Sequence, residues 1–245
     1  MRRVRRKKNL QLYYRMCVLE LFSGTGSVGN VCRRLGCTVT SLDRDMPADI
    51  RTDILDCDDH ALPRDSFDVI WASPPCTEYS VAKTVGVRKL EEANAIVRRT
   101  LDVIEYFAPT YWMMENPQTG LLKSQSVVAD LPYNDLDYCK YGMPYRKRTR
   151  LWNNIEAWIP RPLCKKDCDH MVGNIHEQCA QRGPPLHLTS VRRRWLARDL
   201  YRVPQALTEE PFGLLLLRQP ASPAELLPAT CFFASSCPCT TQFNT

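Results

Sequence analysis

The sequence predicts an α/β fold, with a mostly parallel sheet, helices on both faces and a small Cys/His-rich appendage. Three observations support this prediction. Short apolar runs rich in β-branched residues alternate with segments of helical spacing. Glycines follow the first apolar run, at the position where such sheets bind ligands. With 245 residues, of which 44% are hydrophobic and 24% charged, the chain can also build a packed core.

The first elements follow from the order of apolar and polar residues. Residues 16–21 (MCVLEL) predict a short buried strand, which the segment SGTGS ends. Residues 28–35 have helical spacing. Residues 37–43 (CTVTSLD) are β-branched and end in an acid, so we expect a second strand there.

The later elements repeat this alternation. Residues 67–72 (FDVIWA) predict a buried strand that a Ser-Pro-Pro sequence stops. Residues 111–115 (YWMME) and 148–152 (RTRLW) predict two more strands. Between them, residues 88–107 predict an amphipathic helix, because apolar side chains recur every three or four positions. These side chains are Leu90, Ala93, Val97, Leu101, Ile104 and Phe107.

Composition divides the chain into four segments. Residues 1–15 form a basic N-terminal arm, and residues 16–158 form the main α/β domain. Residues 159–211 form a small region rich in Cys, His and Arg. Residues 212–245 contain only two charged side chains, so we expect a weakly ordered tail there.

Charge and cysteine content limit the classes of function. Six of the 33 basic side chains lie within residues 1–8, and the other 27 match the 27 acidic side chains. The arm therefore either binds a polyanion or is a solvated terminus. The 12 cysteines are scattered, which favours a reducing compartment over a disulfide framework. No apolar run has the length of a membrane span, and no signal-peptide pattern is present.

The segment LELFSGTGSVG has the features of a nucleoside-type cofactor loop. Gly24 and Gly26 lie between a strand and a helix, where glycine lets the backbone approach a ligand closely. Asp43 ends the next strand, where a carboxylate can accept both ribose hydroxyls. Asp53 and Ile54 follow, and can grip and cover an adenine. A tight turn alone would explain the glycines, but the acids that follow favour cofactor binding.

A thiol follows the next strand of the predicted sheet. Cys76 comes directly after two prolines that stiffen its turn, and a cysteine there is either a nucleophile or a small buried side chain. Glu115 ends the following strand at the same edge of the sheet. Strand alternation places Arg148 and Arg150 on one face. We therefore expect a thiol, a carboxyl and two guanidiniums to converge at this edge.

Taken together, these motifs resemble those of the cytosine-C5 DNA methyltransferases. LELFSGTGS resembles the first motif of that family, and Asp43 and the Asp53-Ile54 pair resemble its second and third. SPPCTEYS resembles the motif of the Pro-Cys nucleophile, ENP the Glu-Asn motif, and YGMPYRKRTRLW the motif that ends in Arg-x-Arg. The resemblance covers residues 16–152 in the family's linear order and is closest to the compact enzymes of phages and viruses. Only 93 residues follow Trp152, so the family's large target-recognition region is missing.

The resemblance implies a Rossmann-like fold that binds S-adenosylmethionine. In this alignment of motifs the adenosine packs on Phe22, the ribose binds Asp43, and the adenine contacts Asp53 and Ile54. The full set of implied cofactor contacts is Phe22, Ser23, Gly24, Thr25, Gly26, Asp43, Asp53, Ile54 and Pro74.

The resemblance also implies the roles of the catalytic residues. Cys76 attacks C6 of a cytosine that has been flipped out of the duplex, which makes C5 able to accept a methyl group. Glu115 binds the N3/N4 edge of the base, and Arg148 and Arg150 support the site and the pyrimidine carbonyl. Double-stranded DNA is then the partner, although nothing in the sequence distinguishes DNA from RNA.

Three other functions stay open at this point. SPPC is similar to the SPPY-type loop of exocyclic amino methyltransferases, which act on N4 of cytosine or N6 of adenine without a thiol. An RNA cytosine-C5 methyltransferase and a degenerate fold that binds nucleic acid without turnover are the others. We expect a monomer without a membrane partner, located in the cytoplasm of a bacterium or virus-infected host in association with the nucleoid, or in the nucleus if the chain is eukaryotic.

The appendage contains the residue types of a zinc site. Its possible ligands are Cys164, Cys168, His170, His176 and Cys179. The expected set is Cys164, Cys168, His176 and Cys179, since a tetrahedral site needs four ligands and a short loop has little apolar material for a core. The spacing matches no common zinc finger, so reduced, unlinked thiols remain the alternative. With Arg192, Arg193 and Arg194, this region is the expected DNA-reading element.

Overall fold

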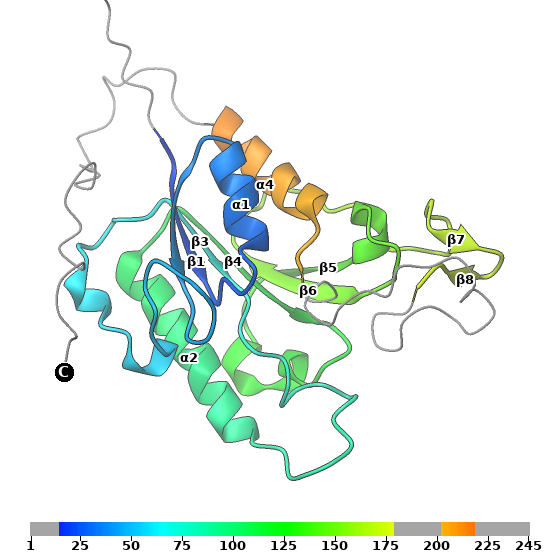
Figure 1. Ribbon diagram of the computed structural model, residues 1–245, viewed down its shortest axis with the longest axis horizontal. Coiled ribbons are helices and arrows are strands. Elements are labelled where there is room, and N and C mark those ends of the chain that lie inside the picture. The colour runs from blue at the N-terminus through cyan, green and yellow to red at the C-terminus, as the bar shows by residue number, and fades with distance from the viewer. Residues whose placement is uncertain (1–14, 179–201, 219–245) are drawn as a thin grey trace, which may run out of the picture.

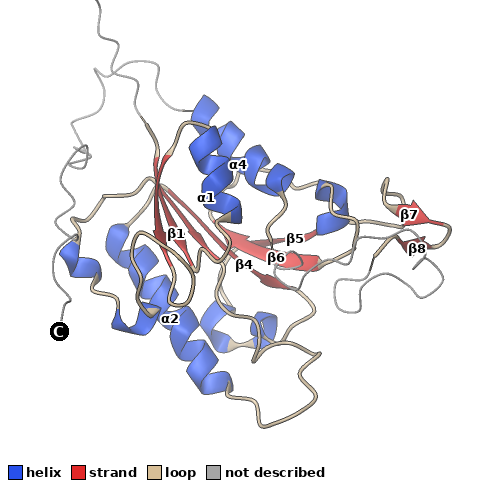
Figure 2. Cartoon of the chain, in the orientation of Figure 1, coloured by secondary structure: helices blue, strands red, loops and turns tan. Residues whose placement is uncertain are grey.

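The computed structural model describes residues 15–178 and 202–218. These residues form one six-stranded sheet with helices on both faces (Figures 1 and 2), which confirms the predicted fold class. The strands of the sheet are β1 (Cys17–Leu21), β2 (Thr38–Leu42), β3 (Val69–Ala72), β4 (Tyr111–Pro117), β5 (Tyr133–Asp137) and β6 (Arg148–Asn153). The helices are α1 (Ser27–Arg34), α2 (Leu90–Phe107) and α4 (Gln205–Leu217).

The strand order determines which loops share an edge. The order is β2-β1-β3-β4-β6-β5, with parallel pairing from β2 to β4 and antiparallel pairing of β6 to both of its neighbours. The carboxyl ends of β1, β2, β3 and β4 therefore lie at one edge of the sheet. The expected cofactor loop, Cys76 and Glu115 all follow or end these strands, so the topology brings them to the same edge.

Two apolar layers cover the sheet. Helices α1 and α4 lie side by side on one face (Figure 1), where they cover Val18, Trp71 and Met113 of the central strands. Helix α2 lies on the other face, which includes Leu19 and Ile70. Successive strand residues point to opposite faces, and both faces are covered, so the central strands are apolar without alternation.

The expectation of a weakly ordered tail that begins at residue 212 is wrong for residues 212–217, which belong to helix α4. Phe212 and Leu215 are buried in the α1-side core and belong to this helix. A helix was not expected here, because Pro211 lies inside it and its apolar residues follow one another without helical spacing. Residues 219–245, the rest of the expected tail, lie outside the described residues.

Strand β5 was not expected, because its sequence YNDLD contains two acids. Arginines directly across from it on β6 compensate these acids, in the register Asp135↔Arg150 and Asp137↔Arg148.

Beyond the sheet, a small hairpin consists of β7 (Met171–Val172) and β8 (Ile175–His176). It belongs to the Cys/His-rich appendage and projects from the β5–β6 side of the sheet (Figure 2).

Candidate active site

The loop after β1 has a backbone that requires glycine. Gly24 and Gly26 have φ angles of +53° and +67°, a region that residues with a Cβ rarely adopt. Phe22 also has a positive φ of 58°, which is uncommon for a residue with a side chain. Gly26 is the N-cap of α1, so the loop turns directly from β1 into the helix.

Asp43 binds this loop, and Asp53 caps a separate turn that follows it. Asp43 accepts hydrogen bonds through Oδ2 from the Gly24 N–H at 2.8 Å, and through Oδ1 from the N–H groups of Asp45 and Met46. Asp53 caps a short 3₁₀ helix by accepting from the Leu55 N–H at 3.0 Å. Oδ2 of Asp43 accepts only one of these hydrogen bonds, so it can accept a second one from a ribose hydroxyl.

A cavity of about 550 Å³ lies against the glycine loop. Its lining includes Ser23, Gly24, Thr25 and Gly26 of the expected cofactor residues. Phe22, Asp43, Asp53, Ile54 and Pro74 do not line it, although Asp43 and Phe22 adjoin the loop. A volume in this range is typical of cofactor sites.

Two buried polar atoms of residues that line this cavity have no hydrogen-bond partner among the described residues. They are Glu20 Oε2 and Ser23 Oγ, on β1 and on the loop that follows it. Burial raises the pKa of Glu20 to about 7, against the opposing effect of the Val28 and Gly29 N–H groups. Unpartnered buried polar atoms are costly, so this wall is suited to a ligand that carries donors or positive charge. S-adenosylmethionine carries both.

The loop after β3 presents Cys76 beside this region. Asn116 of β4 donates from Nδ2 to the Pro74 carbonyl at 2.9 Å, which fixes the loop to the end of the neighbouring strand. Cys76 is half-buried. Burial raises the pKa of its thiol, the Glu115 carboxylate raises it further, and the Lys147 ammonium lowers it. The thiol is therefore mostly protonated in this state and depends on nearby positive charge for its reactivity.

Glu115 is buried at the end of β4 and is held by two donors. Its Oε1 accepts from the Tyr138 hydroxyl at 2.9 Å and from the Lys147 ammonium at 3.1 Å. The same ammonium lies 4.6 Å from the centre of the Tyr138 ring. Tyr138 and Lys147 were not among the expected site residues, although Lys147 directly precedes Arg148, which was.

Arg148 and Arg150 have different partners from those that the sequence suggested. Arg148 binds Asp137 through Nη2 at 2.8 Å, and Arg150 binds Asp135 through Nε at 2.8 Å. Asp137 is fully buried, and although burial raises its pKa, the hydrogen bonds from Arg148 and from the Cys164 N–H hold that pKa below its ordinary value. These ion pairs stabilise the pairing of β5 with β6.

Strand register explains this difference. Residues directly opposite each other in a sheet share a face, and β4 pairs with β6 as Glu115↔Leu151 and Asn116↔Arg150. Glu115 therefore lies on the face opposite to Arg150. Lys147 lies an even number of residues before Leu151, so strand alternation places both side chains on the same face. The Lys147 ammonium is therefore the one that reaches Glu115.

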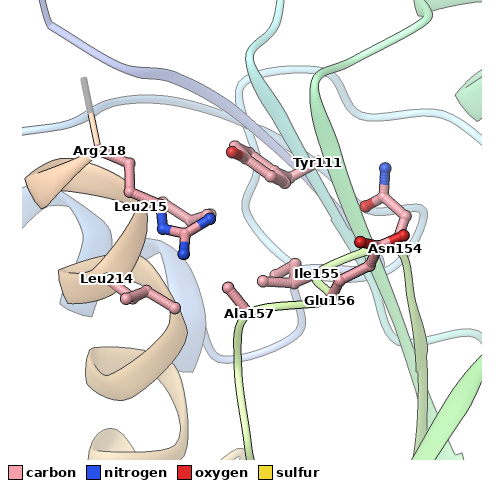
Figure 3. Close-up of a pocket in the computed structure, with 8 residues that line it drawn as sticks. All are labelled: Tyr111, Asn154, Ile155, Glu156, Ala157, Leu214, Leu215 and Arg218. Atoms are coloured by element: carbon pink, nitrogen blue, oxygen red, sulfur yellow. The ribbon is translucent and has the colours of Figure 1, made fainter. Parts of the chain in front are cut away.

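A second cavity, of about 510 Å³, lies at the other end of the sheet (Figure 3). It is bounded by Tyr111 at the start of β4, by residues 154–157 after β6, and by Leu214 and Arg218 at the end of α4. Glu115 lies near the opposite end of β4, so this cavity is separate from the candidate active site.

The appendage brings together three of the four expected zinc ligands. Cys164, Cys168 and His176 lie in one cluster with Cys139, which the sequence analysis did not include. Cys179 lies outside the described residues, as do Arg192, Arg193 and Arg194.

The fold, the cavity at the glycine loop and the adjacent thiol and carboxylate together define a methyltransferase. Comparison with known proteins specifies the class. The family model of the C-5 cytosine-specific DNA methylases matches residues 39–146. A Frog virus 3 (isolate Goorha) protein described as "Probable DNA (cytosine-5)-methyltransferase" is 33% identical over 217 residues, which cover 81% of this chain and 100% of the relative.

Solved structures of methyltransferases are also similar to this chain. EhMeth of Entamoeba histolytica matches with a TM-score of 0.47 and 14% identity, over 67% of this chain and 62% of its own. A DNA modification methyltransferase encoded within an E. coli prophage matches with a TM-score of 0.41 and 16% identity, over 61% of this chain and 52% of its own. The chain thus spans between about half and two thirds of the length of these two structures.

The chain belongs to the C-5 cytosine-specific DNA methylase family. The enzyme class of this family is DNA (cytosine-5)-methyltransferase, and the viral relative agrees with the resemblance to compact phage and virus enzymes. Within residues 15–178 and 202–218, no helix is both long enough and apolar enough to cross a membrane.

Proposed function

We propose that this chain methylates C5 of cytosine in double-stranded DNA, with Cys76 as the nucleophile. The observation that carries the proposal is the position of Cys76 within the electrostatic reach of Glu115 and Lys147, at the sheet edge where the glycine loop lies. A thiol, a carboxylate and an ammonium at one edge are the groups that attack on a pyrimidine ring requires.

The cofactor that we propose is S-adenosylmethionine, which supplies an electrophilic methyl group when bound. The unpartnered Glu20 and Ser23 atoms and the positive-φ glycines fit a cationic ligand with donor groups. Asp43 would hold the ribose through its remaining acceptor sites, and Asp53 and Ile54 would contact the adenine. Phe22 would pack on the adenosine, and Thr25 and Pro74 would complete the contacts.

The residues of the chain account for the remaining steps. The Cys76 thiolate forms a bond to C6 of a flipped-out cytosine, and the C5–C6 π electrons move to C5. Glu115 binds the N3/N4 edge of the base and stabilises the charge of the ring. After methylation, the C5 proton leaves to a base, its bonding electrons re-form the C5–C6 double bond, and the C6–S bond breaks to release Cys76. Arg148 and Arg150, which pair with Asp137 and Asp135, would support the site through β5.

The first experiment identifies the product. The protein is incubated with tritiated S-adenosylmethionine and, in separate reactions, with mixed-sequence duplex DNA or with RNA, and the nucleic acid is digested to nucleosides. We expect label in 5-methylcytosine. Label in an N-methylated base would instead support an amino methyltransferase, and label transferred only to RNA would change the substrate. Cofactor binding without transfer to either nucleic acid would indicate a binding module.

The second experiment tests the role of Cys76. In DNA that contains 5-fluorocytosine, fluorine replaces the proton that must leave C5, so the covalent adduct should persist. We expect an adduct mass with the wild-type chain and none with Cys76→Ser, whose kcat/KM on ordinary DNA should fall by more than about 10³-fold. Cys37→Ser is the matched control, because Cys37 lies at the amino end of β2, away from the site, and should leave both readouts unchanged.

A further inference from the structure

Four metal-ligating side chains meet where the Cys/His-rich appendage joins the sheet. We propose that they form a structural zinc site with the ligands Cys139, Cys164, Cys168 and His176. Their ligand atoms all lie within 4.8 Å of one another, and Cys164 Sγ is 3.5 Å from His176 Nε2. In a tetrahedral zinc site with ordinary bond lengths, a sulfur and a nitrogen ligand lie about 3.6 Å apart.

The donor set favours zinc over other ions. Three thiolates and one imidazole are soft and borderline ligands, which suit tetrahedral zinc and not calcium or magnesium. Cys139, Cys164 and Cys168 are all free, so no disulfide within the described residues competes for these sulfur atoms. His170 lies outside the cluster, with Nδ1 3.9 Å from a Glu177 oxygen.

Within residues 159–178, the part of the appendage that the structure describes ahead of residue 202, large apolar side chains lie exposed instead of packed. Ile159 is 86% exposed, Leu163 37% and Ile175 39%. The β7–β8 hairpin has two residues in each strand, which is too short to be stable in isolation. A metal ion can replace the missing core in such a segment.

Polar contacts already place the ligands on both sides of the junction. Cys164 donates its N–H to Asp137 Oδ2 at 3.0 Å, Lys140 pairs with Asp167 at 2.8 Å, and the Gln178 N–H donates to the Pro144 carbonyl at 3.0 Å. Three ligands belong to the appendage and the fourth, Cys139, belongs to the 3₁₀ helix Tyr138–Tyr141 of the main domain. The zinc ion therefore cross-links the two parts.

This cross-link begins next to the active site. Cys139 directly follows Tyr138, whose hydroxyl donates to Glu115. The site thus fixes the appendage to the same short helix that orients the Glu115 carboxylate. It also identifies the ligand that the sequence analysis missed, because Cys139 lies well before the Cys/His-rich segment.

The test is the zinc content of the full chain, purified without chelator and measured by mass spectrometry. We expect about one zinc ion per chain. Cys168→Ser, at a half-buried position, should lower this to near zero, and so should Cys139→Ser. The matched control is Cys179→Ser, which should keep its zinc. Because Cys139 is buried, its variant is also examined by circular dichroism, and Cys168→Ser provides the same test without a change in the core.

A second readout uses Co²⁺ as the probe in place of zinc. Stripped wild-type protein titrated with Co²⁺ should develop the visible absorption of a tetrahedral cobalt thiolate, with a stoichiometry of about one. Metal-free wild-type protein that gives no thiolate absorption with Co²⁺ would overturn the site. Loss of zinc in Cys179→Ser together with its retention in Cys139→Ser would overturn this ligand set.

Discussion

At the scale of single residues, the pKa of the Cys76 thiol depends on burial and on two nearby groups of opposite charge. Glu115 raises the pKa of its thiol and Lys147 lowers it. A neutral residue at position 147 should therefore leave less thiolate at any given pH, and a neutral residue at position 115 should leave more. Lys147→Gln should slow alkylation of Cys76 by iodoacetamide by about 3- to 10-fold near pH 8, and Glu115→Gln should accelerate it.

The measurement is the alkylation rate of Cys76 as a function of pH, followed by peptide mass spectrometry. The midpoint should move to higher pH in Lys147→Gln, to lower pH in Glu115→Gln, and little in Lys147→Arg. Lys123→Gln is the control, because Lys123 is exposed on a short helix outside the site. Glu115→Gln should also lose methyl transfer despite its more reactive thiol. Equal midpoints in all four variants would contradict the electrostatic argument.

Sequence reasoning located the thiol and the carboxylate but not their cation. Both follow buried strands, and a parallel sheet brings such ends together, so Cys76 and Glu115 could be predicted. The cation depended on register. Only the pairing of β4 with β6 shows that Lys147 lies on the face of Glu115 and that Arg150 lies on the other. Likewise, no local spacing shows that Cys139 approaches Cys164.

At the scale of elements, α1 depends on a close approach to the sheet. A Cβ on Gly29 would collide with the buried Glu20 carboxylate and would lie 3.2 Å from Val39. Gly213 of α4, the neighbouring helix on the same face, has nothing within 4 Å of its Cβ position. A side chain added at Gly29 would therefore meet its neighbours, whereas one added at Gly213 would not.

Replacement by alanine should have opposite effects at these two positions. Gly213→Ala should raise the free energy of unfolding by about 0.5–1 kcal/mol, because alanine favours a helix. Gly29→Ala should lower it by about 1–3 kcal/mol through overpacking. It should also weaken S-adenosylmethionine binding, because the displaced Glu20 lines the cavity. Urea denaturation and cofactor titration of both variants check this, and a stabilised Gly29→Ala would show that α1 has room to move.

The elements differ in how far their sequences determine them. Strand β3 is a continuous apolar run, and β1 and β4 are mainly apolar apart from Glu20 and the Glu-Asn-Pro end of β4, so composition predicts all three. Strand β5 is polar, and its acids become compatible with burial only when β6 supplies Arg148 and Arg150 across the ladder. Helix α4 contains Pro211 and is stabilised by packing on α1 instead of by its own spacing. Tertiary contacts therefore determine whether β5 and α4 form.

At the scale of the whole molecule, net charge is distributed unevenly along the chain. The formal net charge is +6, and residues 1–8 contain six basic and no acidic side chains. Residues 9–245 are therefore balanced. Within the site, several basic groups are already paired with carboxylates, such as Lys147 with Glu115 and Arg148 with Asp137. We infer that the N-terminal arm provides much of the attraction for the phosphates of DNA.

Deletion of residues 1–8 tests this inference, because counterion release makes phosphate contacts visible in the salt dependence of binding. The slope of log K against log salt should become less steep by up to about 5 for six lost charges. The rate of methyl transfer at saturating DNA should stay within about twofold, since none of the expected site residues lies within residues 1–8. Replacement of the six basic residues by glutamine, at unchanged length, separates charge from chain length and should reproduce the deletion. Fluorescence anisotropy with a labelled duplex at several salt concentrations gives the slopes. An unchanged slope in both variants would mean that residues 9–245 make the phosphate contacts themselves.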